Sequence, residues 1–238
     1  MPGIDQSTLR NRLLSTLPPD DFALVAGHLD AFEVCRGESL VEFDAVTDSA
    51  WFFDTGVGSM IAISLEGHRV ETGLFGREGF APAPLALGID RMPYQVLIQV
   101  PGTGHRIGAA ALGDLMARSP ALRVALGRYL QTLGTQIAYT ALSNAVHQID
   151  ERCARWLLMV HDRVDGDDIQ LTHEFLSLML AVRRPSVTTA LHVLEGNGLI
   201  RADRGWVTIR NRAGLEEFAT DAYGRAETEY RRLLGPMA

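Results

Sequence analysis

Lysine is absent from this sequence, and all 22 basic residues are arginine, which we attribute to genomic base composition. Cysteine is nearly absent: Cys35 and Cys153 stand far apart, and neither has the spacing of a metal site or a redox motif. These absences exclude a disulfide framework. They predict two free thiols, which suits a reducing cytoplasm.

Long apolar runs are missing as well. No stretch approaches the roughly 18 consecutive apolar residues that a membrane-spanning helix needs. The segment Met1–Asp20 lacks the apolar core of a secretory signal. We therefore expect a cytoplasmic protein with no membrane partner.

The remaining composition is that of a folded globular protein. The 238 residues are 47% hydrophobic and 21% charged, which allows one large domain or two small ones. The net charge of −7 argues against indiscriminate binding to nucleic acid or to an anionic membrane. A basic patch can still hide within an acidic average, so the charge has to be examined along the chain.

Short strand patterns separated by glycine and proline turns fill the first part of the chain. A helix is expected before them, at Asp5–Leu29. Ser59–Leu65 and Arg69–Phe75 flank Glu66-Gly67-His68, the pattern of a β-hairpin, whereas Gly102–Gly104 is interpreted as a turn. Strands at this spacing indicate an antiparallel β-barrel or jelly roll. The other expected strands are Ser39–Ala45, Trp51–Phe53 and Tyr94–Val100.

After Gly108 the pattern becomes helical. Ala109–Arg118 predicts a short helix, and residues 121–146 contain neither proline nor a strand pattern. Apolar residues recur there every three or four positions, as on one face of a helix about 25 residues and roughly 37 Å long. Such a helix either packs on its own domain or pairs with a second copy, and its length favours pairing. The expected dimer contacts are Leu126, Leu130, Leu133 and Ile137.

Residues 171–209 have the pattern of a winged helix-turn-helix. Thr172 can cap a first helix, Ala181-Val182 form a break, and Pro185 fits the first turn of a second helix. Gly196–Gly198 ends that helix, and two short strands follow at 199–202 and 206–210. The apolar residues expected behind the two helices are Phe175, Leu176, Met179, Leu180, Val187, Ala190, Leu191 and Leu194.

The predicted fold class is therefore α+β, in three parts. Residues 1–118 form the antiparallel barrel or jelly roll, residues 119–146 the dimerisation helix, and residues 147–238 the winged helix-turn-helix. A further helix at Ile149–Val164 opens the third part.

The charge is unevenly divided along these parts. Residues 171–212 hold six arginines and three acidic residues, whereas residues 1–145 hold ten arginines and fifteen acidic residues. A helix that reads DNA enters the major groove with its N-terminal turns toward the bases and needs long hydrogen-bond donors there. Arg183 and Arg184 occupy that end of the second helix. The expected DNA contacts are Thr172, Arg183, Arg184, Ser186, Thr188, Thr189, His192 and Arg204.

Three motifs, in this order, resemble the Crp/Fnr superfamily of bacterial transcription regulators: Ile149–Leu158 (IDERCARWLL), Leu171-Thr172 and Leu194–Ile200 (LEGNGLI). The resemblance covers most of the chain. It implies a cyclic-nucleotide-binding-like barrel, a dimer helix and a DNA-binding winged helix. It also implies a homodimer on double-stranded DNA, at a near-palindromic operator with half-sites about 34 Å apart, and RNA polymerase as a partner.

The residues that grip cyclic AMP in this superfamily are mostly missing. Gly79-Phe80 stands where the family has Gly-Glu, Arg91-Met92 where it has Arg-Ser, and Ile137-Ala138 where it has Thr-Ser. A buried phosphate without these partners is costly, so cyclic AMP is not expected as the effector. Gly79 and Arg91 stay as candidates for binding another small effector, although Arg91 can equally cap a surface turn.

Other cofactors of the superfamily are not expected either. The iron–sulfur branch needs a cluster of cysteines, most of them near the N-terminus, where Cys35 stands alone. His28, His68 and His105 show no pattern that favours haem. We therefore predict no cofactor and no metal.

The second helix of the helix-turn-helix also departs from the cyclic-AMP receptor. Arg184 matches the first arginine that reads DNA there, and it can bond guanine in two places. Pro185 and Thr189 stand where the receptor has a glutamate and a second arginine that also contact the bases. The operator sequence of the family therefore does not transfer to this chain.

Two other classes of function, an enzyme and a protein-binding module, are compatible with this architecture. Similar barrels host metal-dependent oxygenases, but the sequence has no His-x-His pair, no GxSxG motif and no GxxxxGK[ST] loop. We therefore predict no enzymatic activity and no catalytic residues. The alternative left open is a ligand-sensing module whose winged helix contacts protein, and it predicts no salt-dependent affinity for DNA.

Overall fold

The computed structural model describes residues 4–237. The chain begins with the 3-10 turn η1 (Gln6–Thr8), α1 (Arg12–Ser15) and α2 (Pro19–Ala26). The helix expected over Asp5–Leu29 is therefore interrupted. Pro18 and Pro19 explain one break, because proline cannot continue a helix but fits the first turn of the next one.

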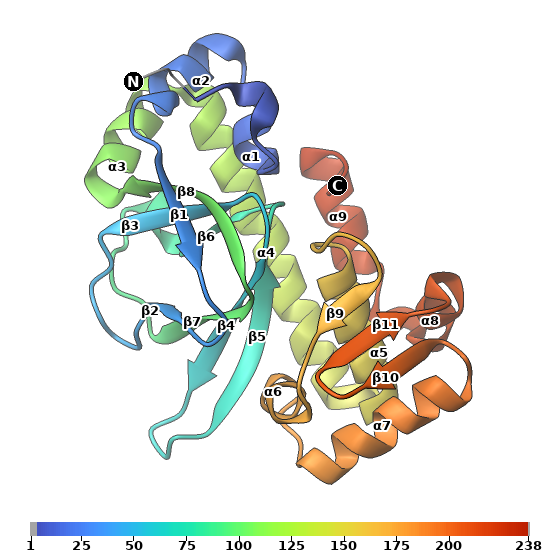
Figure 1. Cartoon of the computed structure of the whole chain (residues 1–238). Coiled ribbons are helices and arrows are strands. Elements are labelled where there is room, and N and C mark those ends of the chain that lie inside the picture. Colours follow the sequence, from blue (N-terminus) through green and yellow to red (C-terminus); the bar gives the residue numbers. More distant parts are fainter. Residues whose placement is uncertain (1–3, 238) are drawn as a thin grey trace.

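Two four-stranded antiparallel sheets follow, in the orders β1-β8-β3-β6 and β2-β7-β4-β5. Figure 1 shows them facing each other on one side of the molecule. The 3-10 turn η2 (Ala83–Leu87) lies between β6 and β7 in the chain. The strands are β1 (Asp30–Val34), β2 (Ser39–Val41), β3 (Ser49–Phe53), β4 (Val57–Ile63), β5 (Arg69–Phe75), β6 (Phe80–Ala81), β7 (Tyr94–Val100) and β8 (Gly102–Gly108).

Aromatic side chains fill the space between the two sheets. Phe52, Phe53, Phe75 and Phe80 are almost wholly buried. The ring centroid of Phe53 lies 5.1 Å from that of Phe32 and 5.4 Å from that of Phe75, both with the edge of one ring toward the face of the other. The antiparallel, jelly-roll-like arrangement confirms the predicted fold class.

Strand β8 corrects the interpretation of Gly102–Gly104 as a turn. Its glycines let it pass very close to neighbouring strands: a Cβ at Gly102 would lie 2.1 Å from the Thr55 carbonyl oxygen, and one at Gly104 would lie 2.2 Å from that of Phe52. Another difference is the early end of β2 at Val41. The next residues form a turn in which Asp44 has a φ of 56°.

Two helices follow the sheets, α3 (Ala109–Arg118) and α4 (Pro120–Val146). Both predicted helices are confirmed. Ser119 caps α4, because its hydroxyl oxygen accepts a hydrogen bond from Leu122 N–H at 3.0 Å. The helix lies against β5, where the Gln136 amide accepts from Leu74 N–H (2.7 Å) and donates to Leu74 O (3.1 Å). Gln136 thus supplies hydrogen-bond partners to the backbone of β5 at the open edge of the second sheet.

The C-terminal part contains the predicted winged helix-turn-helix and a third strand, β9, that the sequence did not predict. Its sheet has the order β10-β11-β9. The elements are α5 (Ile149–His161), β9 (Asp168–Gln170), α6 (His173–Met179), α7 (Arg184–Gly196), β10 (Ile200–Asp203), β11 (Trp206–Ile209), α8 (Arg212–Phe218), the 3-10 turn η3 (Thr220–Ala222) and α9 (Arg225–Leu234).

Packing crosses the predicted domain boundaries at 118/119 and 146/147. Ile61 and Leu74 of the second sheet share one buried cluster with the winged helix-turn-helix. Helix α9 returns to lie along α4 (Figure 1), and its Tyr230 belongs to the same buried cluster as the residues between the sheets. The three-part division therefore stays a prediction, because the C-terminal part is held against the N-terminal part at two places.

Candidate nucleic-acid interface

The helix-turn-helix is built by local signals. Thr172 Oγ1 accepts a hydrogen bond from Phe175 N–H at 3.2 Å and so caps α6. Arg183 is the N-cap of α7, and Pro185 lies in its first turn. Between the helices Ala181 has a φ of 51°, a left-handed conformation that an alanine adopts only at a cost. The tight turn therefore fixes the angle between α6 and α7.

The inner face of this unit agrees with the predicted pattern. Seven of the eight apolar residues expected behind the helices are buried, and Phe175 is half-buried at the edge. Their burial leaves the opposite face of α7 available to a partner.

The eight residues expected to contact DNA fall into two groups. Thr172, Arg183, Arg184, Thr189, His192 and Arg204 are exposed, whereas Ser186 and Thr188 are half-buried. Thr188 Oγ1 donates to Arg184 O at 3.2 Å and lies 3.1 Å from Nδ1 of His173. His173 is a residue of this surface that the sequence did not single out. Its position one residue after the Thr172 cap was the available signal.

The wing turn lies beside the beginning of α6. Leu171 N–H donates to the Gly205 carbonyl at 2.9 Å, which brings Arg204 close to Thr172. Gly205 has a φ of 82°, a left-handed value that the turn between β10 and β11 requires. The exposed residues of the helix-turn-helix and of the wing therefore form one continuous surface.

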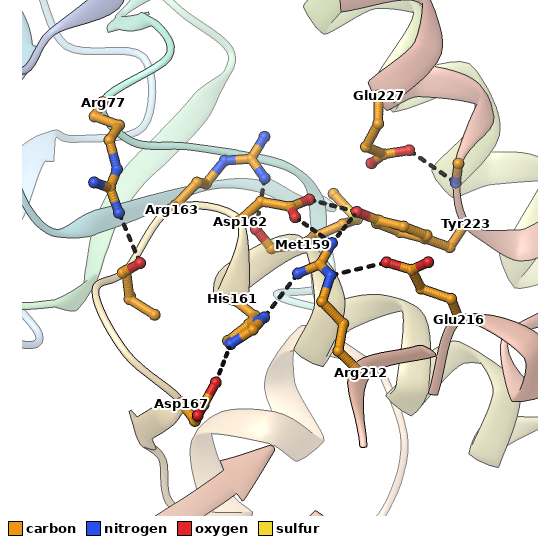
Figure 2. A network of polar contacts seen from close by, with 12 residues as sticks. Arg77, Met159, His161, Asp162, Arg163, Asp167, Arg212, Glu216, Tyr223 and Glu227 are labelled. Atoms are coloured by element: carbon orange, nitrogen blue, oxygen red, sulfur yellow. Dashed lines mark hydrogen bonds and ion pairs between the residues drawn. The ribbon is translucent and has the colours of Figure 1, made fainter. Parts of the chain in front are cut away.

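The structure separates structural arginines from free ones. Arg212 donates to Asp162 (2.6 Å), Tyr223 (2.8 Å), Glu216 (2.8 Å) and His161 Nδ1 (2.7 Å), as Figure 2 shows. Because arginine has no acceptor, His161 Nδ1 is unprotonated, and its Nε2–H donates to Asp167 at 3.0 Å. This network joins α5 to α8 and uses Arg212 as a structural residue.

Of the other basic residues between positions 171 and 212, Arg201 pairs with Asp203 at 2.9 Å. Arg183, Arg184, Arg204 and Arg210 form no ion pair and no side-chain hydrogen bond within residues 4–237. Arg210 follows β11 at the end of the hairpin opposite the wing turn, where its N–H donates to the Leu199 carbonyl at 2.9 Å. Three of these unpaired cations, Arg183, Arg184 and Arg204, lie at the start of α7 and in the wing turn.

The place expected for an effector is filled by the chain itself. A Cβ at Gly79 would lie 2.1 Å from Cζ of Tyr129, whose ring rests on that backbone. Burial raises the pKa of Tyr129 well above its usual range, and its hydroxyl has no partner in the described part of the chain. The remaining cavity is about 20 Å³, room for about one water molecule. It is lined by Glu78, Tyr129, Thr132, Leu133, Gln136, Arg163, Ala226, Glu227, Tyr230 and Met237.

Arg91 has the structural role that the sequence left open. Its side chain is 56% exposed, and its guanidinium donates to the Asp44 carbonyl at 2.7 Å. The backbone of Arg91 also forms an isolated antiparallel β-bridge with the backbone of Val46. It therefore caps the loop between β2 and β3.

Buried polar pairs hold α5 against the N-terminal sheets. Arg163 Nε donates to Glu78 Oε1 at 2.8 Å, and both side chains are 2% exposed. Trp156 Nε1 donates to Glu71 at 2.9 Å, and Ser59 Oγ donates to the same carboxyl group. Burial raises the pKa of Glu71 to about 7. The two parts of the chain are therefore joined by groups whose charges are shielded from water.

Of the four residues expected at the dimer interface, two are buried within the single chain and two are half-buried. Leu126 and Leu133 are buried in the core between the sheets and α4, and Leu130 and Ile137 pack against that core. Leu126 and Leu133 are thus taken up by the chain's own core, whereas the half-buried Leu130 and Ile137 stay a prediction for the dimer interface. A different face of α4 is exposed, with positions spaced alternately by four and three residues: Gly127, Gln131, Gly134, Ala138, Ala141 and Ala145.

Two structural absences apply to residues 4–237. No group of three or more His, Cys, Asp or Glu side chains is arranged to hold a metal ion. No helix in this range is long and apolar enough to cross a membrane.

Two facing antiparallel sheets, a long helix and a winged helix-turn-helix thus follow one another along the chain. Residues 151–218 match the sequence model of the Crp-like helix-turn-helix domain. A search of curated proteins finds no match.

Solved structures of the Crp/Fnr family are similar to the chain. FixK2 from Bradyrhizobium japonicum has a TM-score of 0.67 at 15% identity, over 80% of this chain and 96% of that one. A protein from Eubacterium rectale assigned to the Crp/Fnr family has 0.66 at 16%, over 87% and 97%. A CRP-family regulator from Thermus thermophilus has 0.65 at 17%, over 79% and 96%. The chain therefore has the fold of the Crp/Fnr transcription regulators and carries a Crp-like helix-turn-helix domain, which confirms the resemblance in its motifs.

Proposed function

We propose that this chain is a bacterial transcription regulator that binds specific double-stranded DNA as a homodimer in the cytoplasm and has no enzymatic activity. The observation that supports DNA binding most is the set of unpaired cations on one surface, with Arg183 and Arg184 at the start of α7 and Arg204 in the wing turn. DNA phosphates would neutralise cations that the chain leaves without partners.

The roles of the surface residues follow from their positions. Arg184 lies in the first turn of α7, where a guanidinium can donate two hydrogen bonds to guanine in the major groove. Thr189 and His192 are exposed one and two turns further along the same helix, so they would reach adjacent bases or phosphates. Thr172 and Arg204 flank the helix and would fix its register on the phosphate backbone.

The exposed face of α4 supports dimerisation through residues other than those first expected. Alternating steps of four and three residues are the spacing of a helix seam in a coiled coil. A Cβ at Gly127 or Gly134 would meet nothing within 4 Å, so the chain itself does not require glycine there. Glycine in a helix costs about 1 kcal/mol relative to alanine. Close approach of the α4 helix of a second copy would account for both positions.

A two-fold axis along α4 would place two copies of α7 in successive major grooves of a near-palindromic operator, about 34 Å apart. RNA polymerase would then be a partner at the promoter. The ring of Tyr129 rests on the backbone of Gly79, and the cavity beside Tyr129 has a volume of about 20 Å³. We therefore propose that DNA binding does not depend on an effector at that site.

The test is a selection of duplexes from a random pool by the full-length protein, followed by affinity measurements on an enriched duplex. Arg184→Ala should weaken specific binding by about 1–3 kcal/mol. Arg106→Ala is the matched control, since Arg106 is exposed on β8 and lines no part of this surface; its affinity should equal that of the wild type. Enrichment of no duplex would favour the protein-binding module instead.

A further inference from the structure

A large groove lies between the N-terminal sheets and the helix-turn-helix. The β4–β5 hairpin and β7 form one wall, and α6 with the turn before α7 forms the other. In Figure 1 the hairpin and the α6–α7 turn lie at the same lower end of the molecule. The groove has a volume of about 1,530 Å³, which exceeds the roughly 300–1,000 Å³ of pockets that enclose small ligands.

The groove continues the surface proposed to bind DNA. Thr172 and Arg183 line it, and so do Arg36, His68 and Arg69 of the N-terminal part. Residues from two distant parts of the sequence therefore meet in one concave surface next to the N-terminal end of α7.

Its charge is predominantly positive. Among the lining residues three are arginines, and Glu174 is the acidic one. Arg69 donates to the neutral amide of Gln95. Arg36 donates to the carbonyl oxygens of Gln99 (3.1 Å) and Gln170 (2.9 Å). In the described part of the chain none of the three arginines pairs with a carboxylate. Arg69 and Arg183 are also exposed, so their charges are available to an anionic partner.

We infer that this groove holds the phosphate backbone of the DNA that flanks the sequence read by α7. The inference rests on the proposed function, because it takes the same duplex as its occupant. Continuity with Thr172 and Arg183, the positive lining and the width of the groove all fit a polyanion that extends past the helix-turn-helix.

The contact would make the N-terminal part a second DNA-binding element. Arg36 belongs to the loop after β1, and it bonds to Gln99 in β7 and to Gln170 in β9, so it links the N-terminal part to the C-terminal part. A flank held in the groove would then favour one relative position of the two parts, because it contacts both of them.

The experiment compares two duplexes that share an operator selected by the full-length protein. One is trimmed to the operator, and the other is extended by about ten base pairs on each side, one helical turn. Arg69→Gln should bind the trimmed duplex as the wild type does and the extended duplex several-fold more weakly. The slope of log affinity against log salt for the extended duplex should fall by about one per protomer.

Arg106→Gln is the control, because it removes the same charge from an exposed position on the other sheet. Equal affinity of Arg69→Gln and wild type for the extended duplex would overturn the inference and leave the proposed function intact. The inference would also be overturned if Arg106→Gln lost as much affinity as Arg69→Gln. Failure of the wild-type protein to bind either duplex would instead refute the proposed function.

Discussion

The buried pair of Glu78 and Arg163 gives a quantitative test of how the two parts of the chain are joined. Both side chains are 2% exposed. Arg163→Met would remove the guanidinium and leave the Glu78 carboxylate with the Gly76 N–H, at 3.0 Å, as its remaining hydrogen bond. The Met159 carbonyl would also lose a donor at 2.6 Å. Breaking a buried ion pair in this way costs about 3–5 kcal/mol.

That loss is large against the roughly 5–15 kcal/mol that stabilise a folded domain. Urea unfolding of the full-length protein, followed by circular dichroism, measures it as a shift in midpoint. Glu78→Gln combined with Arg163→Met is the control, because it removes both charges and should recover a large part of the loss. A loss below about 1 kcal/mol for Arg163→Met would refute the claim that this pair is buried and necessary.

Three further predictions concern the turn between α6 and α7, the buried contact between the two parts of the chain, and the exposed face of α4. Ala181→Gly should raise the free energy of unfolding by up to about 1 kcal/mol, since a φ of 51° costs an alanine about 1–2 kcal/mol; a lower thermal midpoint would contradict this. The carboxyl of Glu71 has a pKa raised from 4.5 to about 7 by burial, so the folded protein holds this proton more tightly than the unfolded chain. The free energy of unfolding should therefore fall as pH rises from about 4.5 to about 7, and Glu71→Gln should remove that part of the pH profile. Gly134→Arg should give a monomer in sedimentation, whereas a dimer of wild-type affinity would place the interface elsewhere.

The helix-turn-helix could be predicted almost completely from the sequence because its determinants are local. Thr172 caps one helix, and Pro185 opens the other. Gly198 ends it in a left-handed conformation, with a φ of 70°. Such signals act within a few residues, so they can be identified in the sequence without knowledge of the rest of the fold.

Strand β8 shows why part of the sheet could not be predicted. A segment that contains Gly102, Gly104 and Gly108 resembles a turn in sequence. It is a strand because the glycines allow close passage over Thr55 and Phe52, and these neighbours are some fifty residues away in the chain. Long-range packing of this kind leaves no local pattern.

The candidate site likewise contains residues that local sequence identifies and residues whose role depends on distant parts of the chain. Arg183 and Arg184 could be identified from their position at a helix start, whereas the role of Gly79 depended on a ring that α4 supplies, Tyr129. The apolar face of α4 was correctly located, but its periodicity does not distinguish the chain's own core from a second copy. Leu126 and Leu133 therefore needed the tertiary structure to be assigned.

The proposal as a whole is tested most directly by the salt dependence of DNA binding. The full-length protein would be titrated with a selected duplex by fluorescence anisotropy between about 50 and 200 mM salt, a range over which six to ten phosphate contacts cost about 10³–10⁵ in affinity. A homodimer that uses its unpaired arginines on both half-sites should show a loss of this order. Binding that does not change with salt, or no selected duplex at all, would contradict the account.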